Sequence, residues 1–196
     1  TGGTTGSDHS GNNRSLSLLG DSQWTTGKFR NGLDLDGAGD FAKVFGYKGV
    51  TGKNKRTYSF WLKTNTTGRG ILSSGASSGS GRFALSLDGS GKLKVEYGNG
   101  HVKSAGTLTD DNWHQVVVTL PHEGKISETA IYIDGLYATG SAANGTNAVD
   151  TAATQDVFLG KVGGSFFKGI LDDVRIYIGD LQEETENLEI SAMYSA

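Results

Sequence analysis

Cysteine is absent from the 196-residue sequence, which excludes a disulfide framework and a thiolate metal site. Proline occurs once beside 31 glycines, a balance that favours tight turns between short strands over a helical bundle. No apolar run approaches the roughly 20 residues that a membrane span requires. The formal net charge of −3 is too small to indicate nucleic acid or a membrane surface as a partner, and we expect neither.

Short stretches in which apolar and polar side chains alternate recur along the chain. Tyr58, Phe60 and Leu62, for example, share one face, as on a half-buried strand, and residues 83–97 predict a hairpin. Further strands are predicted at 113–120, 131–137, 157–160 and 166–178, and loops at 73–81 and 139–155. This pattern predicts an all-β fold, a two-sheet antiparallel jelly-roll sandwich with a short helical turn at the C-terminal end.

The chain length fits one domain with a core of its own. Residues 1–7 are small and polar, which is typical of a linker, so we expect a single domain over residues 8–196. A linker at this place indicates a piece of a longer, secreted protein.

The last predicted strand contains two adjacent carboxylates, Asp172 and Asp173. Val174 and Ile176 follow in alternation with Arg175, as expected for a strand with one face in a core. Two like charges side by side are unfavourable without a cation or a basic partner. These acids therefore indicate either a metal site or a pairing with the arginine.

Five segments follow one another in a characteristic order: residues 33–41, 58–63, 112–118, 131–135 and 167–177. Together they resemble the laminin-G-like domains of the concanavalin A-like lectin/glucanase superfamily, and the resemblance extends over nearly the whole chain. It implies a jelly roll of two curved antiparallel sheets, often with a structural calcium ion and often attached to secreted polysaccharide-degrading enzymes. One fold hosts many functions, so the ligand has to be argued from the site.

Acids of two turns and of the last strand are the candidate calcium ligands. Asp172 is similar in position to the acid that opens the last strand in calcium-binding relatives, and Asp8 resembles the acid of an N-terminal Asp-x-Ser-Gly-Asn segment. Calcium prefers six to eight carboxylate, carbonyl and water oxygens, which a Gly/Asp turn also supplies. We expect a structural calcium ion (Ca2+) with the ligands Asp172, Asp36, Gly37, Asp40 and Asp8. The alternative is that these acids only stabilise turns or pair with a neighbouring arginine.

Glycoside hydrolysis needs two carboxylates across the sugar bond, which glucanases of this superfamily supply from a Glu-x-Asp-x-x-Glu strand. The sequence has no such segment, and Glu96 is alone on its predicted strand. A jelly-roll lyase needs clustered His, Tyr and Arg, whereas His101 and Tyr97 occur without a lyase motif. We expect no catalytic activity, and a divergent glycosidase or polysaccharide lyase is the enzymatic alternative.

Carbohydrate binding needs aromatic faces and polar or charged groups along a groove. Tyr97 and His101 are candidate contacts, although the alternation around Tyr97 also fits the core. Phe166 and Phe167 are adjacent and face opposite sides of their strand, so we expect one exposed ring and choose Phe166. Arg82 borders the Gly/Ser-rich loop and is placed to cap a groove.

A basic loop at residues 46–57 adds Lys53, Lys55 and Arg56 to the candidate contacts. Lysine and arginine side chains bind the carboxylates or sulfates of acidic polysaccharides, so this loop indicates an acidic polymer. The alternative is an ordinary solvated loop.

These observations predict a non-catalytic carbohydrate-binding module of a secreted, bacterial polysaccharide-active enzyme. Its expected partners are a polysaccharide and an attached catalytic domain in the full-length protein, and we expect the module to be a monomer. It would raise the local concentration of the catalytic domain on the polymer. The alternative from a different class is an adhesion or spacer domain that recognises protein or no specific ligand.

Overall fold

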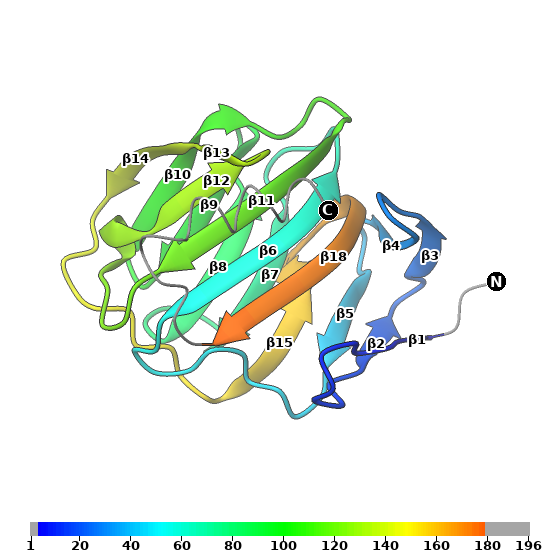
Figure 1. Ribbon diagram of the computed structural model, residues 1–196, viewed down its shortest axis with the longest axis horizontal. Coiled ribbons are helices and arrows are strands. Elements are labelled where there is room, and N and C mark those ends of the chain that lie inside the picture. The colour runs from blue at the N-terminus through cyan, green and yellow to red at the C-terminus, as the bar shows by residue number, and fades with distance from the viewer. Residues whose placement is uncertain (1–3, 179–196) are drawn as a thin grey trace.

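The computed structural model describes residues 4–178, which fold into a sandwich of two antiparallel β-sheets. Figure 1 shows the two sheets as layers, with the smaller sheet in front of the larger one. The predicted all-β jelly-roll sandwich is confirmed, and the one helix in the described range is a single 3-10 turn, η1 (Ile126–Glu128). None of the helical structure at residues 4–178 is long and apolar enough to cross a membrane.

Nine strands form the larger sheet. Their spatial order is β1 (Thr5–Gly6), β2 (Leu16–Leu19), β5 (Phe41–Val44), β15 (Gln155–Leu159), β7 (Gly70–Gly75), β8 (Arg82–Leu87), β9 (Lys92–Tyr97), β10 (Gly100–Thr107) and β14 (Thr139–Ala143). Strand β15 lies between β5 and β7 although it comes much later in the chain, and such non-local pairing is a property of jelly rolls.

Seven strands form the smaller sheet. Their order is β13 (Leu136–Tyr137), β12 (Ala130–Ile133), β11 (Trp113–Leu120), β6 (Arg56–Lys63), β18 (Lys168–Ile178), β4 (Asn31–Asp36) and β3 (Gln23–Thr26). Strand β18, the last in sequence, lies between β6 and β4 and therefore pairs on both sides with strands from the first half of the chain. A separate two-stranded hairpin, β16 (Lys161–Val162) and β17 (Ser165–Phe166), connects β15 to β18.

The core lies between the two sheets and follows from the alternation in the sequence. Leu35 and Phe60 of the seven-stranded sheet pack in one cluster with Leu85 and Val95 of the nine-stranded sheet, and all four side chains are buried. Burying a side chain of this size contributes about 1.5–3 kcal/mol. Residues that alternate with these on the nine-stranded sheet point away from the core, and this outer face carries the features described below.

Three predicted boundaries are wrong. Thr5 and Gly6, expected in a linker, pair with β2, and glycine fits because a Cβ at Gly6 would lie 3.0 Å from ring atoms of Trp24. Residues 73–75 and 139–143, expected in loops, are paired strands, because small residues complete sheet hydrogen bonds as well as large ones. The predicted C-terminal helical turn lies outside the described residues.

Candidate functional site

Three phenylalanine rings gather on the outer face of the nine-stranded sheet. Phe41 begins β5, Phe158 lies in β15, and Phe166 comes from the hairpin strand β17. The ring centres of Phe41 and Phe158 are 5.8 Å apart, and those of Phe41 and Phe166 are 6.2 Å apart. All three rings are partly exposed. We call Phe41, Phe158 and Phe166 the aromatic cluster.

The ammonium group of Lys161 lies above all three rings of the aromatic cluster. Its Nζ atom is 4.3 Å from the ring centre of Phe41, 5.3 Å from that of Phe166 and 5.6 Å from that of Phe158. Such cation–π contacts restrict the side chain without removing its charge, because the rings carry no net charge. In the described part of the chain no carboxylate forms an ion pair with Lys161.

The hairpin that carries Lys161 and Phe166 is seated directly on β7. A Cβ added at Gly70 would lie 2.5 Å from the Val162 nitrogen and 2.7 Å from the Ser165 carbonyl oxygen. The close approach of the two backbones therefore requires glycine at this position.

Two further contacts fix the orientation of the hairpin. The Ser73 hydroxyl donates a hydrogen bond of 2.8 Å to the carbonyl oxygen of Lys161. Phe167 is fully buried in the core, whereas Phe166 is partly exposed, which confirms the prediction that the two rings face opposite sides. These contacts hold the hairpin, with Lys161 and Phe166, against β7.

A depression of about 260 Å³ opens beside the aromatic cluster. Its lining residues are Ser73, Ala76, Ser77, Arg82, Gln155, Phe158, Lys161 and Gly163. Phe158 offers an apolar ring face, Gln155 offers an amide donor and acceptor, and Arg82 and Lys161 offer positive charge. None of the lining side chains found among residues 4–178 is a carboxylate. We call this feature the Phe158 depression.

Arg82 lies at the first position of β8, and its guanidinium reaches the hairpin turn. Its guanidinium makes one long hydrogen bond, 3.4 Å from Nη1 to the Ser77 carbonyl oxygen. The same nitrogen would lie 3.7 Å from a Cβ added at Gly163 of the hairpin turn. No acidic partner of Arg82 occurs within the described range. Arg82 thus lines the Phe158 depression, and its role as a sugar contact stays a prediction.

Other lysines of the same sheet face are neutralised by acids. The Asp156 carboxylate lies 2.7 Å from Lys48 Nζ and 3.1 Å from Lys43 Nζ, and the hydrogen bond from Lys48 lowers the pKa of Asp156 to about 2. Lys94 pairs with Glu96 at 2.6 Å. Lys103 pairs with Asp88 at 2.8 Å. Among the described residues of this sheet face, cations without an acidic partner are therefore Lys161 and Arg82 at the Phe158 depression and Lys92 on β9.

Of the three predicted contacts in the basic loop, the structure contradicts Arg56. Arg56 is fully buried, donates hydrogen bonds to the Thr151 hydroxyl and the Gly52 carbonyl oxygen, and stacks 5.2 Å from the Phe83 ring centre. It has no access to a polysaccharide, so its predicted role is wrong. Lys53 lies 3.9 Å from an oxygen of Glu123, and Lys55 also has an interaction partner.

Tyr97 and His101 are placed apart from the Phe158 depression. The Tyr97 ring packs against the core and its hydroxyl donates to the Asp150 carbonyl oxygen at 2.8 Å, which fits the core alternative, so its role as a sugar contact stays a prediction. His101 faces outward on β10, two strands away from β8 or about 10 Å. Burial and the nearby charges of Lys94 and Lys103 lower the pKa of His101.

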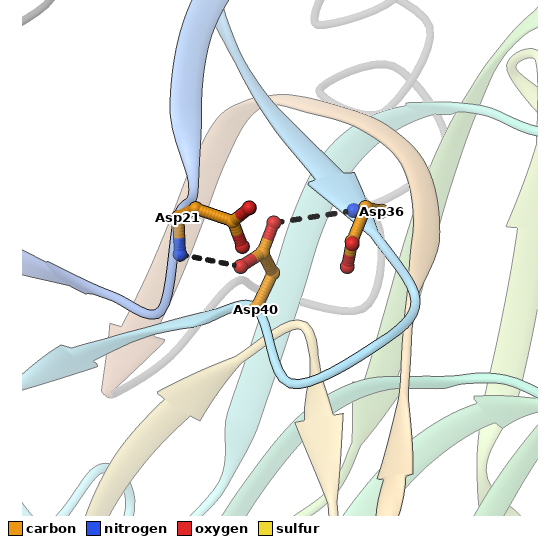
Figure 2. Close-up of side chains that lie close together, drawn as sticks. All are labelled: Asp21, Asp36 and Asp40. Carbon is orange, nitrogen blue, oxygen red and sulfur yellow. Dashed lines mark hydrogen bonds between the residues drawn. The ribbon is translucent and has the colours of Figure 1, made fainter.

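Three carboxylates meet at one corner of the sandwich, as Figure 2 shows. Asp21 follows β2, Asp36 ends β4 and Asp40 precedes β5, and one oxygen of each lies within 4.8 Å of the others. Asp40 accepts hydrogen bonds from the Asp21 nitrogen at 2.8 Å and the Asp36 nitrogen at 3.4 Å. Burial and the adjacent Asp21 carboxyl raise the pKa of Asp40. We call Asp21, Asp36 and Asp40 the acidic corner.

The acidic corner has the donor set that calcium prefers, namely several hard oxygens from separate segments. Asp36, Gly37 and Asp40 share the predicted turn, and Asp21 joins them from the turn after β2. The packing is tight, because a Cβ added at Gly20 would lie 2.5 Å from Asp40 Oδ1. The residues present therefore fit a divalent cation, with each carboxylate retaining lone pairs that the backbone hydrogen bonds leave free.

The structure does not bring Asp172 or Asp8 to this corner, so the single five-residue site is not formed. Asp36 is opposite Lys168 on β18, and Asp172 lies four residues further, about 13 Å along the strand. Its carboxylate accepts hydrogen bonds from the Phe29 and Asp173 nitrogens. Asp173 pairs with an arginine, Arg175, as the alternative interpretation had it.

Asp8 belongs to a turn of its own. Its carboxylate accepts hydrogen bonds of 2.8 Å from the Ser10 and Arg14 nitrogens. The hydrogen bonds from Ser10, followed by that from the Arg14 backbone, lower the pKa of Asp8 to about 2. The Arg14 guanidinium lies over the ring of Tyr47, beyond the end of β5 that is far from Asp40. Asp8 thus stabilises a local turn.

Sequence reasoning missed Phe41, Phe158, Lys161 and Asp21. The alternation around Phe158 contains the information, because Val157 and Leu159 are apolar and face the core, which leaves the ring between them outside. Nothing in the local sequence of Lys161 or Asp21 indicates their neighbours, which come from distant strands.

Comparison with solved structures shows the same fold in carbohydrate-related proteins. Domain 4 of AbnA, an extracellular arabinanase from Geobacillus stearothermophilus, solved in complex with arabinotriose, is 19% identical with a TM-score of 0.66; the match covers 91% of this chain and 87% of that chain. The botulinum neurotoxin serotype D ligand binding domain, solved with N-acetylneuraminic acid, is 16% identical with a TM-score of 0.64. This chain is covered to 96% in that match but spans only 47% of the toxin domain.

A sialidase from Trypanosoma rangeli in complex with sialic acid matches 99% of this chain and 31% of its own, with 16% identity and a TM-score of 0.65. At these identities the likeness establishes the fold. Among curated proteins no sequence matches this chain. The family model of the concanavalin A-like lectin/glucanases superfamily matches residues 36–185, which is most of the sequence. The chain therefore belongs to the concanavalin A-like lectin/glucanases superfamily.

Proposed function

We propose that this domain is a non-catalytic carbohydrate-binding module of a secreted, bacterial polysaccharide-active enzyme, and that it binds its polymer at the Phe158 depression. The observation that carries the proposal is the combination of a partly exposed ring, an amide and two cations around one depression. An aromatic face and fixed polar groups are what a sugar ring requires, with an apolar surface and a rim of hydroxyls. In this proposal the module acts as a monomer beside an attached catalytic domain.

The structural neighbours support a carbohydrate ligand without specifying it. The arabinanase domain was solved with arabinotriose, and the toxin domain was solved with N-acetylneuraminic acid. The volume of about 260 Å³ lies just below the range of drug-sized pockets, which fits one sugar unit of a longer polymer. We therefore expect weak binding per site, because a shallow hollow buries little area.

The experiment is affinity electrophoresis through gels that contain single polysaccharides, neutral or acidic. The wild-type domain is compared with Phe158→Ala and with the control Phe45→Ala, which removes a more exposed ring of the same sheet face. Retardation by one polymer class that falls at least about tenfold in affinity with Phe158→Ala, but not with the control, supports the site. Retardation that Phe158→Ala leaves intact places the site elsewhere on the domain.

Structural calcium remains part of the proposal, with the acidic corner as its site. The ion would bind Asp21, Asp36 and Asp40 and neutralise carboxylates that crowd one another. It would join the turn after β2 to the turn between β4 and β5, so its effect is expected on stability rather than on sugar contact.

A second candidate function is a divergent glycosidase, because another depression contains carboxylates. It has a volume of about 210 Å³ and includes Asp34, Asp36 and Asp111 together with Lys63 and Lys168. Release of reducing sugar from any polymer of the panel, lost in Asp111→Asn, would favour this function over the module. Binding of protein but of no polymer would favour an adhesion domain.

A further inference from the structure

We propose that the Phe158 depression selects an anionic sugar, one that carries a carboxylate or a sulfate group next to an apolar ring face. This inference rests on the proposed function and adds the chemical class of the ligand. It also assigns recognition of the anionic group to Lys161 of the hairpin and Arg82 of β8, and not to the basic loop.

Lys161 is prepared for an anion before the ligand arrives. Three phenylalanine rings lie within 5.6 Å of its ammonium group and restrict a side chain that is otherwise flexible. Binding a carboxylate or sulfate then costs less side-chain entropy at Lys161, so more of the interaction energy appears as affinity. The same rings exclude water from one side of the ammonium group, which strengthens its attraction to an anion.

Arg82 supplies a second cation to the lining of the depression. The guanidinium offers five N–H donors, and the described contacts use only one long hydrogen bond to the Ser77 carbonyl oxygen. Planar guanidinium groups bind carboxylates and sulfates through two parallel hydrogen bonds, a geometry that a neutral hydroxyl does not match. An anionic sugar between Arg82 and Lys161 would satisfy both groups.

Most other lysines near this sheet face are already paired with an acid. Lys43, Lys94 and Lys103 of the sheet and Lys48 of the loop after β5 each have a carboxylate partner within 3.1 Å, whereas Lys92 on β9 lies outside the depression. An anion at any of those lysines would have to compete with that acid. The lining of the Phe158 depression, as described, contains no acid that would repel the ligand.

The experiment measures the affinity of the domain for three polymers of similar chain length by titration calorimetry and gel retardation. One polymer consists of uronic acids, one is sulfated and one is neutral, so the arms separate carboxylate from sulfate recognition. The variants are Lys161→Gln and Arg82→Gln, with Lys94→Gln and Lys53→Gln as charge-matched controls. Lys94 pairs with Glu96 on the same face, and Lys53 belongs to the basic loop.

The expected result is that one anionic polymer binds at least about tenfold more tightly than the neutral polymer. Lys161→Gln and Arg82→Gln are each expected to lower the affinity for it by about tenfold, whereas each control changes it less than about twofold. The melting temperatures of all four variants are expected to match that of the wild type, since these are partly exposed side chains.

Two outcomes overturn the inference while the module stands. Equal binding of the neutral polymer, lost in Phe158→Ala but not in Lys161→Gln or Arg82→Gln, would show a sugar site without charge selection. Loss of anionic binding to the same extent in Lys94→Gln or Lys53→Gln would show diffuse attraction to the whole surface. Retardation by none of the polymers would overturn both this inference and the proposed function.

Discussion

The basic loop and the Phe158 depression contain the same kinds of side chain in opposite electrostatic situations. In the loop, Arg56 is buried and hydrogen-bonded to neighbouring residues, and Lys53 lies near Glu123. At the depression, Lys161 and Arg82 are partly exposed and have no acidic partner among the described residues. A cation that is buried or paired contributes to stability, whereas one that is held in place and unpaired is available to a ligand.

The largest loss of stability is expected on replacing Arg56, a buried cation that contacts only the protein itself. Arg56→Ala removes a buried side chain that packs on Phe83 and donates hydrogen bonds to the Thr151 hydroxyl and to the Gly52 carbonyl oxygen. We expect the free energy of unfolding to fall by about 3 kcal/mol, measured by urea denaturation. Lys53→Ala is the control and is expected to change it by less than about 0.5 kcal/mol. Equal effects of the two substitutions would remove the distinction between buried and solvated charge in this loop.

The acidic corner allows the same comparison for negative charge, because its carboxylates form no ion pair among the described residues. The pKa of Asp40 is raised by burial and by Asp21, so ionisation of this group in the folded state opposes stability at neutral pH. Calcium at 100 times its dissociation constant is expected to raise the free energy of unfolding by about 2.7 kcal/mol, measured as a melting shift that a chelator reverses. Asp40→Asn is expected to abolish the shift. A melting temperature that is independent of calcium would contradict the calcium proposal.

The hairpin offers a test of positioning without any change of charge. Gly70→Ala places a methyl group 2.5 Å from the Val162 nitrogen, so the hairpin with Lys161 has to move. We expect a loss of about 2 kcal/mol in stability and a loss of polymer binding in gel retardation. Gly89→Ala, where a Cβ meets open space, is the control. Unchanged binding in Gly70→Ala would mean that the site tolerates displacement of its lysine.

Replacing His114, a partly buried group paired with two acids, is expected to lower the free energy of unfolding slightly and in a pH-dependent way. His114 is partly buried, which opposes its charge, but hydrogen bonds to Asp134 at 2.7 Å and Asp110 at 3.0 Å outweigh burial and raise its pKa. Its contribution to stability is therefore full below the unfolded-state pKa near 6.5 and is lost as the pH rises through the higher folded-state pKa. Melting curves of the wild type and His114→Gln between pH 5.5 and 9 are expected to converge at the alkaline end. Parallel curves over this range would contradict the prediction.

The strands of the sandwich were predictable because each alternation of side chains is local. Tyr58, Phe60 and Leu62 alternate in the sequence and are buried on one face of β6 as predicted. Strands β2, β3, β7, β10 and β14 were not predicted, and in β7 and β14 the serine, alanine and glycine residues give no apolar alternation. Their pairing depends on neighbours from other parts of the chain.

The candidate site was predictable only in part for a related reason. Arg82 and Phe166 were identified from a glycine-rich border and from a pair of adjacent rings, and both lie at or beside the depression. Arg56 was misassigned because the sequence counts charges without showing which of them the fold buries or pairs. Asp172 was misassigned because register along β18, set by its partners β4 and β6, decides what lies beside it.

The sequence by itself determined the all-β class and the core faces of the strands with a clear apolar alternation, because these follow from composition and from the period of two along a strand. The superfamily was recognised from the order of five segments. The tertiary structure alone decided which charges remain unpaired. Lys161 meets Phe41 across more than a hundred residues of chain, and Asp21 meets Asp40 from another turn, because the crossovers of the two sheets place distant segments side by side. Ligand chemistry depends on such neighbours, and their identity is a property of the folded chain.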